Sequence, residues 1–170
     1  MTGGSLLSSL PETTIIGRLL IAMVLGACIG LDREIKRRPA GLRTHILVTL
    51  ASAAFTLITI EVYQATLRES GNAVGARADP IRVVEAVTAG VAFIAAGAII
   101  RHSDGDVQGV TTGAAIWLAG AIGVACGIGY YIVAVGVTVM AILVLQGLSW
   151  VETRLRGADT VAEPDNDPKK

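Results

Sequence analysis

Five apolar stretches separated by short polar segments make up most of this chain. They predict five transmembrane helices, at about residues 15–31, 44–63, 81–100, 112–127 and 131–150. The first of these is at the short end of what crosses a hydrocarbon core ~30 Å thick. Around this domain of residues 15–151, the pattern predicts a polar leader at residues 1–14 and a charged, disordered tail at residues 152–170. The predicted fold class is an all-α integral membrane protein.

The polar segment between the first two stretches, residues 30–45, is densely charged, and we call it the hinge. Its ionisable residues are Asp32, Arg33, Glu34, Lys36, Arg37, Arg38, Arg43 and His45. An Asp, Lys or Arg at the centre of a bilayer costs about 3 kcal/mol on the insertion scale, so the hinge must lie in water or among headgroups. Pro39 disfavours a helical conformation at Arg38, which predicts a break between the two helices.

Basic residues are unevenly divided between the two sides of the predicted spans. If the amino terminus is outside, the inner side carries Arg33, Lys36, Arg37, Arg38, Arg43, Arg101, Arg154, Arg156, Lys169 and Lys170. The outer side then carries Arg18, Arg68, Arg77 and Arg82. Because Lys and Arg are enriched in cytoplasmic loops, this distribution predicts an external amino terminus and an internal carboxy terminus.

The composition agrees with a bilayer and argues against a soluble domain. Apolar residues make up 52% and charged residues 16%, whereas about a quarter of a soluble protein is charged. The lipid bilayer is therefore the first expected partner. The formal net charge is zero, so nothing in the bulk electrostatics indicates a nucleic-acid partner.

Small residues recur every four positions along several predicted spans. The sets are Ala22, Gly26 and Gly30; Ala86 and Gly90; Ala92 and Ala96; and Ala115, Ala119, Gly123 and Gly127. Such stripes let helix backbones approach closely in lipid, so we interpret them as packing grooves. A pore lining or an intersubunit interface is the alternative interpretation.

No pattern of an enzyme is present, and the sequence predicts neither a catalytic residue nor a cofactor. Cys28 and Cys126 lie in apolar runs without metal-ligand spacing, and the centres of the five spans lack ionisable residues. The absence of a midplane charge argues against a proton-coupled pump, although a channel lined by carbonyls or hydroxyls remains compatible. His45 and His102 are interpreted as interfacial polar side chains.

Three further polar features carry specific predictions. Arg82 and Glu85 fall three residues apart at the start of the third span and are expected to form an interfacial pair. Either Thr111 or Thr112 is expected to cap the fourth span. A divalent-cation site could be formed by Asp32, Glu34, Asp104 and Asp106. The neighbouring Arg and Lys favour salt bridges within the hinge instead.

The hinge and two later segments resemble the MgtC/SapB family of membrane proteins. The first matching block is Gly-Leu-Asp-Arg-Glu at residues 30–34 followed by Arg-Pro-Ala-Gly-Leu-Arg-Thr-His at residues 38–45. The others are residues 79–101, with Asp-Pro-Ile-Arg at the start, and residues 107–123, with Val-Gln-Gly-Val-Thr-Thr-Gly. Ala92, Ala95, Val110 and Gly113 depart from the family pattern by apolar or small-for-small exchanges. Since about twenty residues follow the fifth span, we expect the membrane domain alone, without the ACT-like carboxy-terminal domain of some members.

The resemblance implies a multi-pass protein of the bacterial cytoplasmic (inner) membrane, linked to growth in low magnesium and to virulence. It also implies a regulator that acts on other membrane machinery such as the ATP synthase. We therefore predict a non-enzymatic regulator working through protein contacts, with a channel or transporter for Mg²⁺ or another small solute as the alternative. A structural role as a homo-oligomer is compatible with both. The predicted cytoplasmic contact face comprises Asp32, Arg33, Glu34, Arg38, Arg43, Thr44, His45, Arg101, Thr111 and Thr112.

Overall fold

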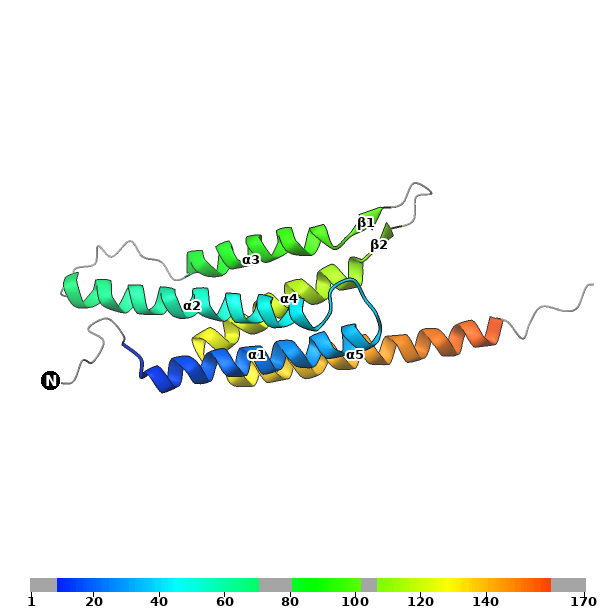
Figure 1. The fold of residues 1–170 in the computed structure, drawn as a ribbon, viewed down its shortest axis with the longest axis horizontal. Coiled ribbons are helices and arrows are strands. Elements are labelled where there is room, and N and C mark those ends of the chain that lie inside the picture. Colours follow the sequence, from blue (N-terminus) through cyan, green and yellow to red (C-terminus); the bar gives the residue numbers. More distant parts are fainter. Residues whose placement is uncertain (1–8, 71–80, 102–106, 160–170) are drawn as a thin grey trace, which may run out of the picture.

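The chain folds into five helices and one short hairpin in a computed structural model (Figure 1). The structure describes residues 9–70, 81–101 and 107–159, and side chains within 9–68, 81–100 and 107–147. The elements are α1 (Glu12–Ile35), α2 (Leu42–Ser70), α3 (Ile81–Gly97), β1 (Ile100–Arg101), β2 (Val107–Gln108), α4 (Val110–Ile128) and α5 (Tyr131–Asp159). Among the described residues, α1, α2 and α4 contain segments long and apolar enough to cross a membrane.

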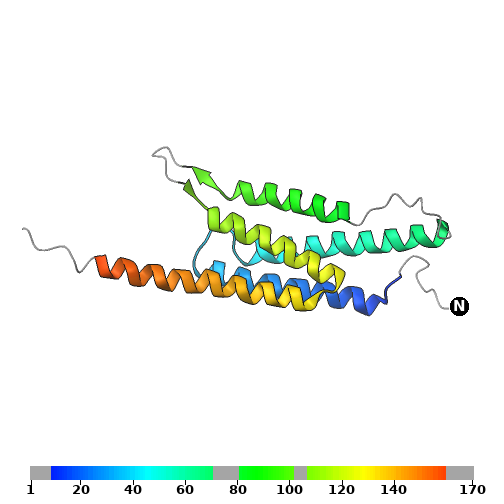
Figure 2. The ribbon, with the colours of Figure 1, turned by 180° about the vertical axis from the view of Figure 1, so that it is seen from behind.

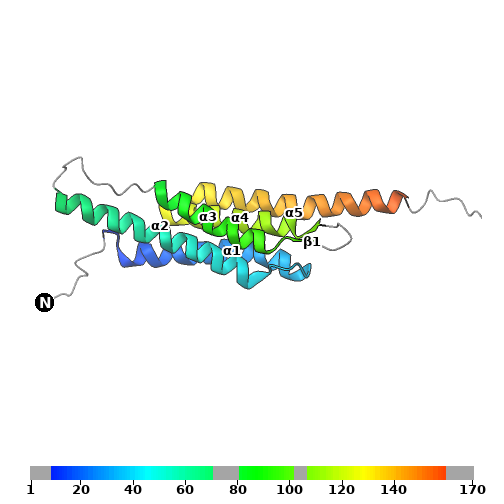
Figure 3. The same ribbon diagram turned by 90° about the horizontal axis from the view of Figure 1, so that it is seen from above.

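The five helices run side by side along the long axis of the molecule (Figures 1 and 2). Helix α2 packs most extensively against α1 and α4, whereas α3 packs mainly against α4. Helix α5 contacts α4 and α1 and continues past the end of the other helices in every view (Figure 3). Helices α1, α2 and α4 therefore form the centre, and α3 and α5 lie on its outside.

The same capping motif ends α1 and α4. In α1, the Arg38 amide donates to the Arg33 carbonyl and the Arg37 amide to the Glu34 carbonyl, each at 3.0 Å. These two bonds define a Schellman motif, whose left-handed position is usually glycine. Arg37 occupies that position with φ 52°, which costs on the order of 1 kcal/mol for a residue with a Cβ. In α4 the left-handed residue is Gly129, with φ 97°.

A seam of hydroxyls and glycines joins the three central helices. Thr49, Ser52 and Thr56 lie on one face of α2 and are almost completely buried. A Cβ added to Gly123 of α4 would lie 2.6 Å from the Ser52 Cβ, and one added to Gly127 would lie 2.6 Å from the Thr56 Cβ. We call this contact the glycine–hydroxyl seam; it fills the small-residue grooves of α1 and α4 from within the chain.

The small-residue stripes of α1 and α4 are thus packing grooves, as predicted. The hydroxyls facing them are satisfied locally: Thr49 Oγ1 donates to the His45 carbonyl at 2.9 Å, and Thr56 Oγ1 to the Ser52 carbonyl at 2.8 Å. The stripes of α3 differ, because they remain exposed and a Cβ added to Gly90 would meet nothing within 4 Å. The pattern alone did not distinguish these two situations.

Several predicted boundaries are wrong; helix α1, for example, runs from Glu12 to Ile35 rather than from residue 15 to residue 31. Helix α2 continues to Ser70, seven residues beyond the predicted end of the second span at residue 63. Helix α3 ends at Gly97 rather than at residue 100, because Ile100 pairs with Gln108 in the hairpin. Helix α5 continues to Asp159, so the beginning of the expected disordered tail is helical. At these positions the helix ends at a different residue from the apolar run, because polar residues can also continue a helix.

Candidate functional site

The hinge closes the end of the bundle where α1, α2 and α4 meet. Its turn is fixed by Glu34, whose carboxylate accepts a hydrogen bond from the Leu42 amide at 2.9 Å. A carboxylate there satisfies a free N–H at the positive end of α2. Gly41 gives it room, because a Cβ at that position would overlap the Glu34 side chain. At Gly30 a Cβ would lie 2.7 Å from the Leu42 Cα, so the two helices touch backbone to backbone.

Lys36 forms an ion pair within the hinge and also connects the hinge to α5. Lys36 Nζ lies 3.0 Å from Asp32 Oδ1, one helical turn away, and also donates to the Leu145 carbonyl at 3.1 Å. Salt bridging within the hinge, which the sequence favoured over a cation site, is thereby confirmed for Asp32. The Lys36 ammonium ties the end of α1 to the point at which α5 leaves the bundle.

A buried arginine connects the hinge to α4. The Arg33 side chain is only 3% exposed, and its Nη2 donates to the Thr112 hydroxyl at 2.8 Å. The prediction that Thr111 or Thr112 caps α4 is wrong, since α4 begins after Gly109 in a left-handed conformation. Thr112 instead accepts a charge-assisted hydrogen bond, which is stronger than a neutral one.

His45 lies inside this end of the bundle and is fully buried. Its Nδ1 is 2.9 Å from the Gly41 carbonyl, one turn back along α2. The interpretation of His45 as an interfacial side chain is therefore wrong: close approach at Gly30 places it against α1 rather than in the headgroups. Three buried atoms here have no hydrogen-bond partner among the described residues, namely Asp32 Oδ2, Arg33 Nε and His45 Nε2.

The predicted cytoplasmic face consequently divides into an interior and an exterior. Asp32, Arg33, His45 and Thr112 are buried and hold helices together, so they do not form a face. The exposed members are Glu34, Arg38, Arg43 and Thr111, with Thr44 half-buried. Arg101 lies in β1, and its side chain falls outside the described part. Lys36 was not among the predicted residues, although its spacing of four from Asp32 could have revealed the pair.

The predicted interfacial pair lies elsewhere, on α3. Arg82 and Glu85 occupy its opening turns, and both side chains are exposed. The ion pair found among the described residues joins Lys36 and Asp32, and none joins Arg82 to Glu85 there. Their pairing stays a prediction.

The opposite end of the bundle is closed by two other charged residues. The Glu61 carboxylate of α2 accepts hydrogen bonds from the Ser9 hydroxyl at 2.9 Å and from the Leu10 amide at 3.1 Å. Arg18 of α1 donates to the Gly127 carbonyl at 2.6 Å, near the end of α4. Both side chains satisfy backbone groups at helix ends, which is a structural use of charge.

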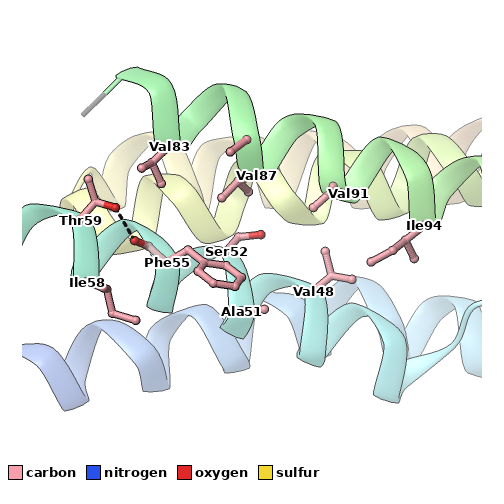
Figure 4. A pocket seen from close by; sticks show the side chains of 12 residues that line it. Val48, Ala51, Ser52, Phe55, Ile58, Thr59, Val83, Val87, Val91 and Ile94 are labelled. Carbon is pink, nitrogen blue, oxygen red and sulfur yellow. Dashed lines mark hydrogen bonds between the residues drawn. The ribbon is translucent and has the colours of Figure 1, made fainter. Parts of the chain in front are cut away.

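Two apolar grooves open on the outside of the bundle. The larger, of about 390 Å³, lies between α2 and α3. Figure 4 shows Val48, Phe55 and Ile94 around it, with the Thr59 hydroxyl bonded to the Phe55 carbonyl. The second, of about 320 Å³, lies between α4 and α5 and is lined by Leu145 at the hinge end. Neither groove is lined by a charged side chain.

The described residues contain no group of three or more His, Cys, Asp or Glu that could hold a metal ion. Two members of the alternative cation site, Asp104 and Asp106, lie outside those residues, as does His102. The other two are engaged, Asp32 with Lys36 and Glu34 with the Leu42 amide.

Comparison with known proteins gives one family and several relatives. Residues 19–154 match the model of the MgtC family. Protein SapB of Bacillus subtilis is 34% identical over 94% of this chain and 67% of its own length. YhiD of Escherichia coli K12, whose name proposes magnesium transport, is 36% identical over 81% of this chain and 62% of its own.

Protein MgtC of Salmonella typhimurium is 36% identical over 72% of this chain and 47% of its own length. The chain spans roughly half to two thirds of the length of these relatives. No solved structure matches it.

Proposed function

Because this chain belongs to the MgtC family, we propose that it is a non-enzymatic regulator in the bacterial inner membrane, acting through contacts with other membrane proteins. The contacts use the exposed part of the hinge, with Arg38, Arg43 and Glu34 on its surface. The chain is linked to magnesium limitation or to virulence-type stress. The ATP synthase is the partner that the family resemblance suggests.

The observation that carries this proposal is the glycine–hydroxyl seam. The buried hydroxyls of α2 are the polar groups best placed to line a path through the bundle, and they are packed against glycines of α1 and α4. Their bonds go to carbonyls of their own helix. A closely packed interior supports signalling from the surface rather than conduction.

The proposed topology has five spans, an external amino terminus and a cytoplasmic hinge. Helices α3 and α5 are the two spans without a long apolar segment, since α3 has 17 residues and the apolar part of α5 is Tyr131–Gly147. Both are at the lower limit of span length, and local thinning of the bilayer accommodates such short stretches. Reporter fusions at the two termini test this topology.

Co-purification in mild detergent tests the regulatory role. We expect Arg43→Ala to lose the membrane partner that the wild type retains, because Arg43 is exposed at the start of α2. Arg68→Ala, at the opposite end of the same helix and also exposed, is the matched control and should keep it. Retention of every partner by Arg43→Ala contradicts the proposal.

A channel or transporter for Mg²⁺ or another small solute is the second candidate. It is favoured by the buried ionisable residues Asp32, Arg33 and His45, since such groups within a membrane domain often mark an ion path. The name of YhiD points in the same direction. Robust Mg²⁺ uptake by purified protein in proteoliposomes would make transport the preferred function.

Homo-oligomerisation is compatible with either role. The alternative of an intersubunit interface along the α4 stripe is disfavoured, because Ala115 and Ala119 are 5% and 0% exposed within one chain. The exposed stripe of Ala92 and Ala96 on α3 is the better place for it. Crosslinking of single cysteines at these two positions tests that interface.

A further inference from the structure

We propose that the hinge and the α4–α5 groove together bind one anionic phospholipid, with its phosphate on Arg37 and Arg38 and an acyl chain in the groove. This inference goes beyond the proposed function and holds for either a regulator or a transporter. It rests on three observations: a strained arginine, its connection to the groove and the chemistry of the groove.

Arg37 is the first observation. It holds the left-handed position of a Schellman motif, where glycine carries no steric penalty, and its side chain is exposed. Neither Arg37 nor Arg38 has a side-chain hydrogen bond or ion pair within the described part of the chain. A guanidinium that is kept at a strained backbone position and left without an acceptor is suited to bind a phosphate from outside.

The second observation connects the hinge to the groove through the residue that precedes Arg37. Lys36, which precedes Arg37, donates to the Leu145 carbonyl, and Leu145 lines the hinge end of the α4–α5 groove. Thr111, with an exposed hydroxyl, lines the same groove. The hinge follows the apolar run of α1, so its cations lie at headgroup depth.

The groove itself is the third observation. Its volume of about 320 Å³ is lined by apolar side chains of α1, α4 and α5, apart from Thr111. An acyl chain therefore fits its chemistry, whereas a polar solute does not. The larger α2–α3 groove is also apolar, but among the described residues no hinge side chain bonds to a residue that lines it. The charge complementarity therefore belongs to the α4–α5 groove.

Native mass spectrometry of the purified chain tests the proposal. Wild type is offered equal amounts of phosphatidylglycerol and phosphatidylcholine in detergent. We expect it to retain phosphatidylglycerol preferentially, and Arg37→Gly to lower that preference about fivefold. Glycine relieves the strained position, so this variant should fold at least as well as the wild type, and a loss of lipid cannot come from unfolding.

The groove is tested with matched substitutions. Ala114 is exposed and lines the α4–α5 groove, while Ala86 is exposed and lines the α2–α3 groove. Ala114→Phe should abolish the phosphatidylglycerol preference, and Ala86→Phe should keep it. Arg68→Gln, at the other end of the bundle, should also keep it.

Four results would overturn the proposal. They are equal retention of the two lipids by wild type, an unchanged preference in Arg37→Gly, an unchanged preference in Ala114→Phe, and displacement of the lipid by millimolar inorganic phosphate. The last result would show a free-anion site without a role for the acyl chain.

Discussion

Glycines in the central helices and glycines in the outer helices have different surroundings. At Gly123 of α4, an added Cβ would overlap the backbone of α2, whereas at Gly136 of α5 it would meet nothing within 4 Å. Gly26, Gly123 and Gly127 face the hydroxyl-bearing residues of α2, whereas added Cβ atoms at Gly90, Gly136 and Gly147 of the outer helices would meet nothing within 4 Å. A small-residue stripe therefore creates a close contact only where another helix supplies side chains of matching size.

The largest effect should come from filling the seam. Gly123→Ala places a methyl group against the Thr49 carbonyl and the Ser52 Cβ, which we expect to cost about 2 to 3 kcal/mol of unfolding free energy. Gly136→Ala should instead add about 0.5 kcal/mol, because alanine is the better helix former. Denaturant unfolding in mild detergent, followed by circular dichroism, measures both. Equal changes in unfolding free energy at the two positions would contradict the difference between glycines of the central helices and glycines of the outer helices.

The next effect concerns the buried arginine. Thr112→Val leaves the Arg33 guanidinium without its acceptor, and we expect a loss of about 2 kcal/mol. Thr88→Val, an exposed position on α3, should change stability by less than about 0.5 kcal/mol. The double variant Arg33→Met with Thr112→Val should be more stable than the sum of the single losses implies, since both polar partners are removed. Strict additivity in this cycle would mean that the 2.8 Å contact contributes nothing.

The smallest effect should come from the cap of α2. Glu34→Ala removes the acceptor of the Leu42 amide and should cost about 1 kcal/mol. Glu85→Ala, at an exposed carboxylate on α3, is the matched control and should be nearly neutral. Thermal unfolding of the two variants side by side decides whether the hinge carboxylate stabilises the fold or is merely on its surface.

The sequence predicted much of this architecture because long apolar runs indicate helices and charged segments indicate the turns between them. The five helices, the turn at the hinge and the packing role of the Gly26 stripe all follow from that pattern. It could not predict that His45 is buried, because a histidine near a helix end is equally suited to a headgroup region. Its burial depends on how closely α1 approaches α2 at Gly30, which is a tertiary property.

The separation of the hinge into buried and exposed side chains also could not be predicted from the sequence. Neighbours such as Arg33 and Glu34 have the same local composition, yet one is 3% exposed and the other lies on the surface. Which of them faces inward depends on the angle at which α4 crosses α1, since Arg33 meets Thr112 across that contact. Helical periodicity places residues on faces but does not say which face a distant helix will cover.

The link between α4 and α5 consists of Gly129 and Tyr130. The Tyr130 amide bonds back to the Ala125 carbonyl at 2.8 Å, so the chain has no spare length between the two helices. In the proposed five-span topology, this short link makes α4 and α5 a single helical hairpin. We expect the hairpin to enter the lipid as a unit, with the longer apolar helix α4 compensating for the short apolar part of α5.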